Sequence, residues 1–182
     1  MNLTNHFLLA LPTLHQDYFA ATLTYICEHS DDGAMGFVVN RPSDVSVLEL
    51  LNELNLNPKR HWVDHPVIAG GPVSTDRGFM LFAGEHTYDS SLTVTDGVHL
   101  TSALESLRAV ANDEGPERFM IALGYAGWQG GQLESEIARN LWLTVEADPS
   151  VLFDQPFEQR LDAAAGLLGI DLSLVSPEAG HS

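Results

Sequence analysis

The sequence predicts one domain that mixes strands and helices in irregular order, without the strict βαβ alternation of doubly wound folds. A length of 182 residues suits a single domain that buries roughly 70% of the surface of its unfolded chain. Several apolar segments have the length of strands and are placed to pair as hairpins. Helical periodicity separates them at uneven intervals, and no repeat, low-complexity tract or long linker divides the chain.

Eight apolar segments predict strands, at residues 7–11, 23–29, 34–40, 67–69, 78–83, 92–95, 119–123 and 141–147. The second and third flank a Ser-Asp-Asp-Gly turn, so we expect them to form a hairpin that ends at Asn40-Arg41-Pro42. Gly70-Gly71-Pro72 and Asp96-Gly97 are strong turn signals after the fourth and sixth segments.

Helices are predicted where apolar residues recur at a spacing of three or four. One begins at Ser46, which with Glu49 fits a capping box, and one at Ser102, which pairs in the same way with Glu105. A further helix covers residues 157–168 and ends at Gly169. Residues 16–22 suit one or two helical turns, and the tail from residue 177 is expected to be loose.

The segment from 119 to 143 combines a strand, a glycine-rich turn from Gly124 to Gly131, and a helix that begins at Gln132. Glycine-rich turns before helices cradle phosphates in other proteins. The spacing here matches neither a Walker A loop nor G-x-G-x-x-G, and Glu134 in the first helical turn would repel an anion. We therefore favour a structural turn packed by Trp128 over a phosphate site.

Charge excludes several classes of function. Eight Lys+Arg against 25 Asp+Glu give a net charge of −17, which repels nucleic acids and anionic lipids. The single cysteine, Cys27, excludes an intrachain disulfide and suits a reducing compartment. No signal peptide or membrane span is recognisable, so we expect a cytoplasmic protein without direct nucleic acid binding or membrane contact.

Two motifs suggest chemistry but have simpler explanations. His61 and His65 have the spacing of metal ligands on a helix, but prolines on both sides favour a solvent-exposed loop. Cys27 and His29 would lie on one face of a strand, as a thiol and its base would, yet a lone cysteine in an apolar strand is most often a core residue. We predict no metal and no cofactor, and we assign no catalytic residue.

Three turns marked by glycine or proline each follow an apolar strand, and together they predict a ligand- or partner-binding surface if they converge. Three unrelated turns remain the alternative. The residues of this candidate site are Asn40, Arg41, Gly70, Gly71, Arg77, Gly124, Tyr125, Trp128 and Gly131.

Long blocks of the chain resemble the bacterial YqgE/AlgH family. They read FLLALPTL, YICEHSDDGAMGFVVNRP, GGPV followed by DRGFMLF, and ALGYAGWQGGQLESEIARNLWL, and LFDQPFEQRLDAAAGLLGID is similar to the C-terminal helix of the family. The resemblance covers nearly the whole chain. Leu161 departs from the tryptophan that members often carry before the small residues of this helix, which is expected to alter packing.

The resemblance implies an α+β fold, a single compact domain with a twisted, bulged, partly barrel-like mixed sheet flanked by helices. It implies little about function, because the family is largely uncharacterised. Its AlgH branch takes its name from the regulation of alginate production and is labelled a transcriptional regulator. The charge of −17 and the lack of a recognisable helix-turn-helix do not support direct DNA binding.

Two hypotheses follow. The favoured one is a non-catalytic regulatory or interaction protein with an unidentified protein partner, whose binding Trp128→Ala would weaken while the fold survives. The alternative is an enzyme or small-ligand binder with a cleft at the same turns, in which Cys27 or Arg41 would act. The sequence does not predict the oligomeric state.

Overall fold

The computed structural model describes residues 1–11, 18–59 and 65–174. The chain divides into two compact units. The first unit combines Met1–Asn40 with Ala126–Ser182, and the second unit is Arg41–Tyr125. The expectation of a single domain over residues 1–182 stays a prediction, and each unit is described by itself below.

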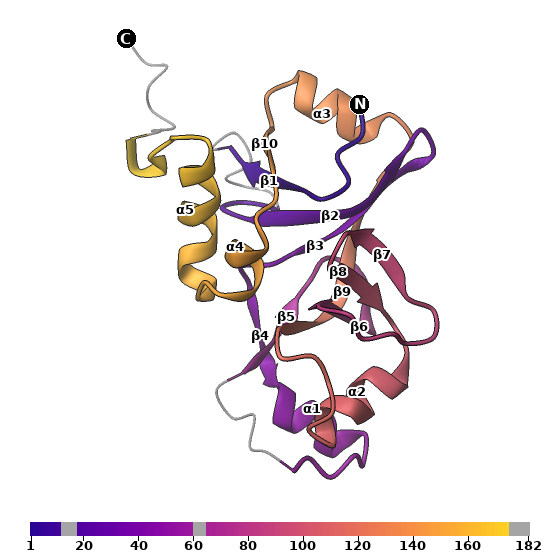
Figure 1. Ribbon diagram of the computed structural model, residues 1–182. Helices are drawn as coiled ribbons and strands as arrows, with labels where there is room; N and C mark the ends of the chain where they lie inside the picture. Colours follow the sequence, from indigo (N-terminus) through magenta and orange to yellow (C-terminus); the bar gives the residue numbers. More distant parts are fainter. Residues whose placement is uncertain (12–17, 60–64, 175–182) are drawn as a thin grey trace. The chain divides into compact units, whose positions relative to one another are not determined.

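The first unit contains antiparallel strands in an order that differs from their order in the chain (Figure 1). The neighbours are β10 (Trp142–Glu146), β1 (His6–Ala10), β2 (Leu23–Ser30), β3 (Gly33–Val38) and the second part of β9 (Phe119–Gln129). The predicted hairpin is β2 with β3, which turns at Asp31-Asp32. A bulge at Cys27 interrupts this pairing, because Ile26 pairs with Gly36 and Glu28 with Met35.

The second unit carries the remaining strands, and here the pairing is mixed. The first part of β9 is antiparallel to β6 (Val73–Ala83), which pairs with β8 (Val98–Thr101), and β8 pairs with β7 (Leu92–Thr95). On its other side β9 runs parallel to β5 (Pro66–Ala69), which pairs antiparallel with β4 (Pro42–Ser46). The structure confirms the predicted α+β class with a bulged mixed sheet and flanking helices.

Short helices accompany each group of strands. The first unit has α3 (Gln132–Ala138), α4 (Pro149–Phe153), α5 (Phe157–Leu167) and the 3₁₀ helix η2 (Leu172–Leu174). The second unit has α1 (Val47–Glu53) and α2 (Leu104–Ala111), which lie beside each other (Figure 1). No helix among the described residues is both long and apolar enough to cross a membrane.

Each unit buries an apolar cluster. In the first unit, the N-terminal segment, the strands and α3 contribute Leu3, Leu8, Ala10, Ile26, Ala34, Ala126, Trp128, Leu133 and Trp142. In the second unit, α1 and α2 cover the sheet, and the helices and strands together contribute Val47, Leu51, Val67, Met80, Phe82, Val110, Ala111 and Ile121. Removal of these side chains from water is the main favourable term that holds the helices in place.

The two predicted helix caps have different outcomes. The Ser46 side chain accepts a hydrogen bond from the Glu49 backbone N–H, so the cap of α1 is confirmed. The cap at Ser102 is wrong, because α2 begins after Ala103 and no side chain caps it. Thr101 instead accepts a hydrogen bond from the Ala103 N–H, which fixes the chain just before the helix.

A buried arginine anchors α5 in the first unit. Arg160 donates one hydrogen bond to the carbonyl of Val39 at 2.6 Å and another to that of Gln155 at 3.0 Å, and its guanidinium lies over the ring of Phe157. Burial lowers the pKa of Arg160 to about 10, so the group remains charged at neutral pH. Arg160 thus supplies the hydrogen-bond donors for these two carbonyl oxygens.

The central segment needs the main correction. We expected a strand that stops at Leu123 and a turn from Gly124 to Gly131, but β9 continues as a strand through Gln129. Gly124 lies within it in the left-handed region, with φ of 77°, and only Gly130 and Gly131 form the turn before α3. Ladder hydrogen bonds to β6 and β3 outweigh the low strand propensity of glycine here.

Other elements differ less. Every predicted strand is present, but β4, β8 and α4 were not predicted. The two expectations for residues 16–22 and for the C-terminal tail concern segments that lie partly or wholly outside the described residues. Tyr18 to Ala21 form a turn.

Candidate functional site

Parts of all three predicted turns meet in the second unit. The Ala69 N–H donates to the carbonyl of Arg41, and the Gly70 N–H donates to that of Leu123, both at 2.9 Å. Arg41, just before β4, and Gly70 and Gly71, just after β5, therefore lie beside Gly124 in the middle of β9. The convergence of these residues supports a candidate site there.

The backbone segments of this site approach each other most closely at Gly124. A Cβ atom built on it would lie 2.5 Å from the carbonyl oxygen of Gly71 and 3.2 Å from that of Val73. Only a residue without a side chain permits this approach, and the φ of 77° also favours glycine. The local sequence is thus explained by backbone packing.

Opposite Gly124, β6 makes a wide bulge. Val73 pairs with Tyr125 and Gly78 pairs with Leu123, so the four residues from Ser74 to Arg77 face a single residue of β9. All four are exposed, and Ser74 has a positive φ of 47°. Bulges of this kind redirect side chains, and here the bulge presents Arg77 to solvent.

An arginine of the bulge and two aromatic rings are in contact with one another. The Arg77 guanidinium carbon lies 5.0 Å from the centre of the Phe79 ring, and the Phe79 ring meets Tyr125 edge to face at 5.9 Å. Phe79 is buried, Tyr125 is half-buried and Val73, which pairs with Tyr125, is exposed. We call Val73, Arg77, Phe79 and Tyr125 the bulge surface.

Sequence reasoning missed Phe79 and the bulge. The apolar segment that begins at Gly78 marks the strand, but the polar residues before it resemble a loop. The available signal was the spacing of Arg77 and Phe79, because residues two apart in a strand share a face.

Asn40 has a structural role in the first unit. Its side-chain oxygen accepts a hydrogen bond from the Leu23 N–H at 2.9 Å, and its amide donates to the carbonyl of Ala21 at 3.0 Å. These bonds fix the start of β2. The polar atoms of Asn40 are therefore engaged by the chain's own backbone.

Trp128 also belongs to the first unit and is only 6% exposed. Its ring stacks with Phe19 at 5.9 Å and meets Trp142 at 6.2 Å. The expectation that Trp128 contacts a partner while the fold tolerates its removal does not suit this position. The structural interpretation, in which Trp128 packs the segment, agrees with it.

Gly131 precedes α3 with φ of 79° and no side-chain cap. The Gln132 side chain instead accepts a hydrogen bond from the Gln129 N–H. Glu134 occupies the first turn of this seven-residue helix, as predicted, so its negative charge already complements the helix dipole.

Cys27 is 1% exposed and lies at the bulge of β2. Burial, followed by the charge of Glu28, raises the pKa of the Cys27 thiol far above its usual range. A neutral, inaccessible thiol is a poor nucleophile. The core interpretation of Cys27 therefore agrees with the structure, and the nucleophile hypothesis does not.

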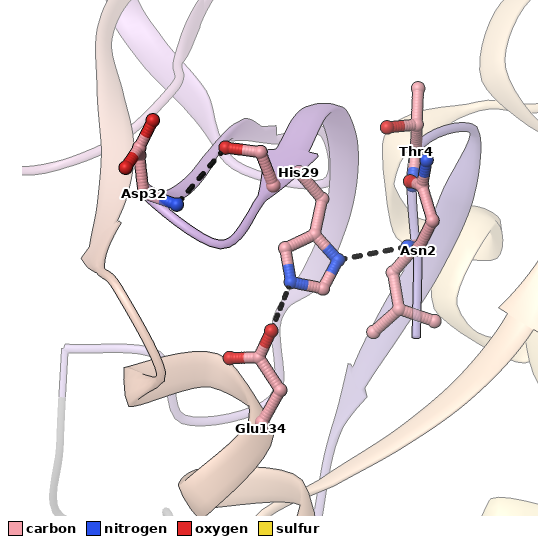
Figure 2. Close-up of polar contacts among 7 residues, drawn as sticks. Asn2, Thr4, His29, Asp32 and Glu134 are labelled. Carbon is pink, nitrogen blue, oxygen red and sulfur yellow. Dashed lines mark hydrogen bonds and ion pairs between the residues drawn. The ribbon is translucent and has the colours of Figure 1, made fainter.

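His29 pairs with a residue that the sequence did not indicate. Its Nε2 lies 2.6 Å from Oε1 of Glu134, and its Nδ1 lies 2.9 Å from the backbone nitrogen of Leu3. Figure 2 shows the ring between Glu134 of α3 and the N-terminal segment that carries Asn2 and Thr4. No local signal could reveal this pair, because 105 residues separate its members.

The second unit also has a polar hollow of about 530 Å³ near the β7–β8 turn. Its lining includes His86, Thr93, Asp96 and His99. His99 lies within hydrogen-bonding distance of the Gly84 carbonyl at 3.0 Å and of the Thr93 hydroxyl at 3.1 Å, so both ring nitrogens have partners. The hollow has the volume of a ligand pocket, but no residue of the predicted candidate site lines it.

The described part of the chain contains no group of three or more His, Cys, Asp or Glu side chains arranged to hold a metal ion. Of the two histidines in the His61 and His65 motif, His65 is among the described residues and His61 is not.

The chain is similar to known proteins over almost its whole length. The model of a family described as AlgH-like, DUF179, matches residues 7–173. A UPF0301 protein of Chromohalobacter salexigens is 52% identical over 186 residues, with 100% of this chain and 99% of that protein covered. A UPF0301 protein of Nitrosospira multiformis is 48% identical, with 100% and 98% covered.

The chain is also similar to solved structures. The solution structure of the AlgH protein from Pseudomonas aeruginosa is 44% identical, with a TM-score of 0.82, and covers 100% of this chain and 97% of that one. Protein DIP2367 of Corynebacterium diphtheriae is 20% identical with a TM-score of 0.69, over 87% and 83% of the two chains, and shows the fold alone.

Proposed function

This chain belongs to the AlgH-like family, and we propose that it is a non-catalytic regulatory protein that recognises a protein partner through the bulge surface. The observation that carries the proposal is that Arg77 lies over the ring of Phe79, which meets Tyr125 edge to face. These side chains are next to the close backbone approach of Gly71 and Gly124.

The composition of the bulge surface suits protein recognition. Tyrosine, phenylalanine and arginine are enriched at the centres of protein interfaces, and tyrosine and arginine often carry much of the binding energy. Arg77 is held by the ring beneath it, so less side-chain entropy is lost when a partner binds. A net charge of −17 argues against nucleic acid as the partner.

The backbone below this surface supports the same role. Paired residues on neighbouring strands form a line across the sheet, from Arg41 through Ala69 and Leu123 to Gly78. This line crosses three gaps between strands, each about 4.8 Å wide. Arg41, just before β4, and Gly78, next to Arg77, are therefore roughly 14 Å apart. A partner could contact both arginines without a change in the backbone.

The test is affinity capture from native lysate with three variants. Arg77→Ala and Tyr125→Ala alter the bulge surface, and Arg139→Ala removes the same charge from an exposed position in the first unit. We expect a stoichiometric partner to bind the wild type and Arg139→Ala but to be lost with the other two. Circular dichroism confirms that all three remain folded.

The proposal fails if Arg77→Ala and Tyr125→Ala retain every protein that the wild type captures. It also fails if Arg139→Ala loses the partner to the same extent, since binding would then depend on total charge.

The hollow beside the β7–β8 turn carries a second candidate function, the binding of a small molecule. Its volume of about 530 Å³ falls in the range of ligand pockets. Mass spectrometry of molecules released from the captured protein tests it. A compound that is retained by the wild type and by Arg77→Ala, and is lost with His86→Ala, would favour ligand binding over partner recognition.

A further inference from the structure

The two neighbours of His29 define which tautomer its neutral ring adopts. A backbone N–H can only donate, so Nδ1, which lies 2.9 Å from the Leu3 nitrogen, must accept and carries no proton. Nε2 then carries the proton and donates it to Glu134 at 2.6 Å. The side chain of His29 is 1% exposed, so water does not replace either partner readily.

Leu3 is connected through this bond to the core of the first unit. Its side chain is 6% exposed and packs in the cluster that contains Trp128 and Trp142. The Leu3 carbonyl accepts a hydrogen bond from the His6 N–H, which closes a tight turn. The backbone bond to His29 therefore helps to hold an apolar side chain in place.

Asn5, two residues after Leu3, is held in place by other hydrogen bonds. Asn5 donates its N–H to Ile26, accepts at its carbonyl from the Ala147 N–H, and accepts at its side chain from the Tyr25 hydroxyl. Any release at Leu3 would thus stop before Asn5. The part that depends on His29 is the N-terminal segment from Met1 to Thr4.

We propose that His29 and Glu134 form a pH-dependent latch that holds the N-terminal segment when His29 is neutral and releases it when His29 is protonated. Protonation places a hydrogen on Nδ1, which then faces the hydrogen of the Leu3 N–H, and the bond is lost. Glu134 keeps the ring in position, because a carboxylate pairs with the imidazolium as well as with the neutral ring. Leu3 then leaves the cluster.

Other charged groups surround the latch. The N-terminal segment and β1 carry the chain's ammonium group and His6, β2 and its turn carry Glu28, Asp31 and Asp32, and α3 carries Glu134 and Glu136. Strand β3, which pairs Ala34 with His29, has no titratable side chain.

Glu134 itself does not supply the transition. A hydrogen bond from its own backbone N–H, followed by that from His29, lowers the pKa of the Glu134 carboxyl. It therefore remains ionised while pH falls through the range in which histidines titrate, and protonates only below its usual range. A change between pH 8 and pH 5 therefore does not come from Glu134.

The test is an NMR titration of the ¹⁵N-labelled full chain from pH 8 to pH 5. Long-range spectra of the imidazoles report which nitrogen of His29 carries the proton, and the Leu3 amide reports the bond. We expect the proton on Nε2 at pH 8, and a Leu3 amide shift that follows the signal of the His29 ring through the titration.

Two variants separate the latch from other titrations. His29→Asn keeps an acceptor oxygen near the place of Nδ1 but cannot titrate, so the Leu3 amide should lose its transition. Glu134→Gln removes the charge that favours the imidazolium, so the midpoint should move to lower pH. A transition that persists in His29→Asn, or a Leu3 amide in the wild type that ignores pH, would overturn the proposal. If His29→Asn does not fold, an unchanged midpoint in Glu134→Gln has the same meaning.

Discussion

At the scale of single residues, backbone geometry explains much of what glycine does in this chain. Gly124 and Gly131 have nearly the same left-handed φ, 77° and 79°, but different surroundings. A Cβ atom added to Gly124 would lie 2.5 Å from the carbonyl oxygen of Gly71. A Cβ atom added to Gly131 would have no atom within 4 Å. The pair therefore separates backbone strain from a steric clash.

We predict that Gly131→Ala lowers the free energy of unfolding by about 1–2 kcal/mol, which is the cost of the left-handed region for a residue with a side chain. Gly124→Ala adds overpacking against backbone, so its loss should reach about 2–5 kcal/mol. Urea denaturation of the two variants checks this. Equal losses would show that the strands around Gly124 move apart without cost.

Cys27 is predicted to be inert in the folded protein. Its thiol is buried and its pKa is raised by burial, so no thiolate is available at neutral or mildly alkaline pH. A thiol reagent should label the native chain only at the rate of unfolding, and should label one thiol at once in guanidinium chloride. Rapid labelling of the native protein at pH 7 would contradict this burial.

At the scale of elements, the same sequence pattern produced one helix cap and failed to produce another. Ser46 and Ser102 each have a glutamate three residues later, but only Ser46 accepts the N–H of its glutamate. Strand β8 ends at Thr101, and Thr101 takes over the fixing of the chain before α2. Tertiary pairing thus moved the start of α2 by one residue.

The two serines give a matched comparison of helix capping. Ser46→Ala should lower the free energy of unfolding by about 1 kcal/mol, because an N–H of α1 loses its acceptor. Ser102→Ala should change it by less than about 0.5 kcal/mol, as expected for a surface substitution that removes no cap. Thermal or urea denaturation measures both. Similar losses for the two variants would contradict the assignment of the caps.

Strand β9 shows how an element can override its composition. Its glycines have low strand propensity, but β6 pairs with its first part and β3 with its second. The ladder supplies hydrogen bonds that a free turn would leave to water. Because β9 continues, Trp128 points into the core of the first unit and is not presented at the surface of a turn.

At the scale of the whole molecule, charge is the dominant property. A net charge of −17 at neutral pH produces self-repulsion in the compact state, which is stronger than in the expanded chain. Salt shortens the range of this repulsion, from a Debye length of about 30 Å at 0.01 M to about 10 Å at 0.1 M.

We therefore predict that the melting temperature at pH 7.5 rises as sodium chloride increases from about 0.01 M to about 0.3 M, a range over which the Debye length falls several-fold. The control is the same titration near the isoelectric point, about 4.5, where the effect should largely disappear because net repulsion is absent. A melting temperature that falls with salt at pH 7.5 would show that attractive ion pairs outweigh the repulsion.

The candidate site was predictable only in part. Arg41, Gly70, Gly71, Gly124 and Tyr125 were chosen from turns after apolar strands, and Arg77 as a side chain that could line a cleft beside them. All six lie in the second unit, where Arg41, Gly70, Gly71 and Gly124 are close together. Asn40, Trp128 and Gly131 were chosen on the same grounds but lie in the first unit. Turn composition reports local backbone geometry and does not report which turns meet.

By itself the sequence determined most of the strands and helices, the hairpin of β2 and β3, and the cap at Ser46, since each depends on residues within a few positions of one another. The tertiary structure alone decided that β9 continues through Gly124, that Trp128 is buried, and that His29 meets Glu134. These outcomes depend on contacts between residues far apart in the chain, and their free energies are set by packing and by which buried polar groups find partners.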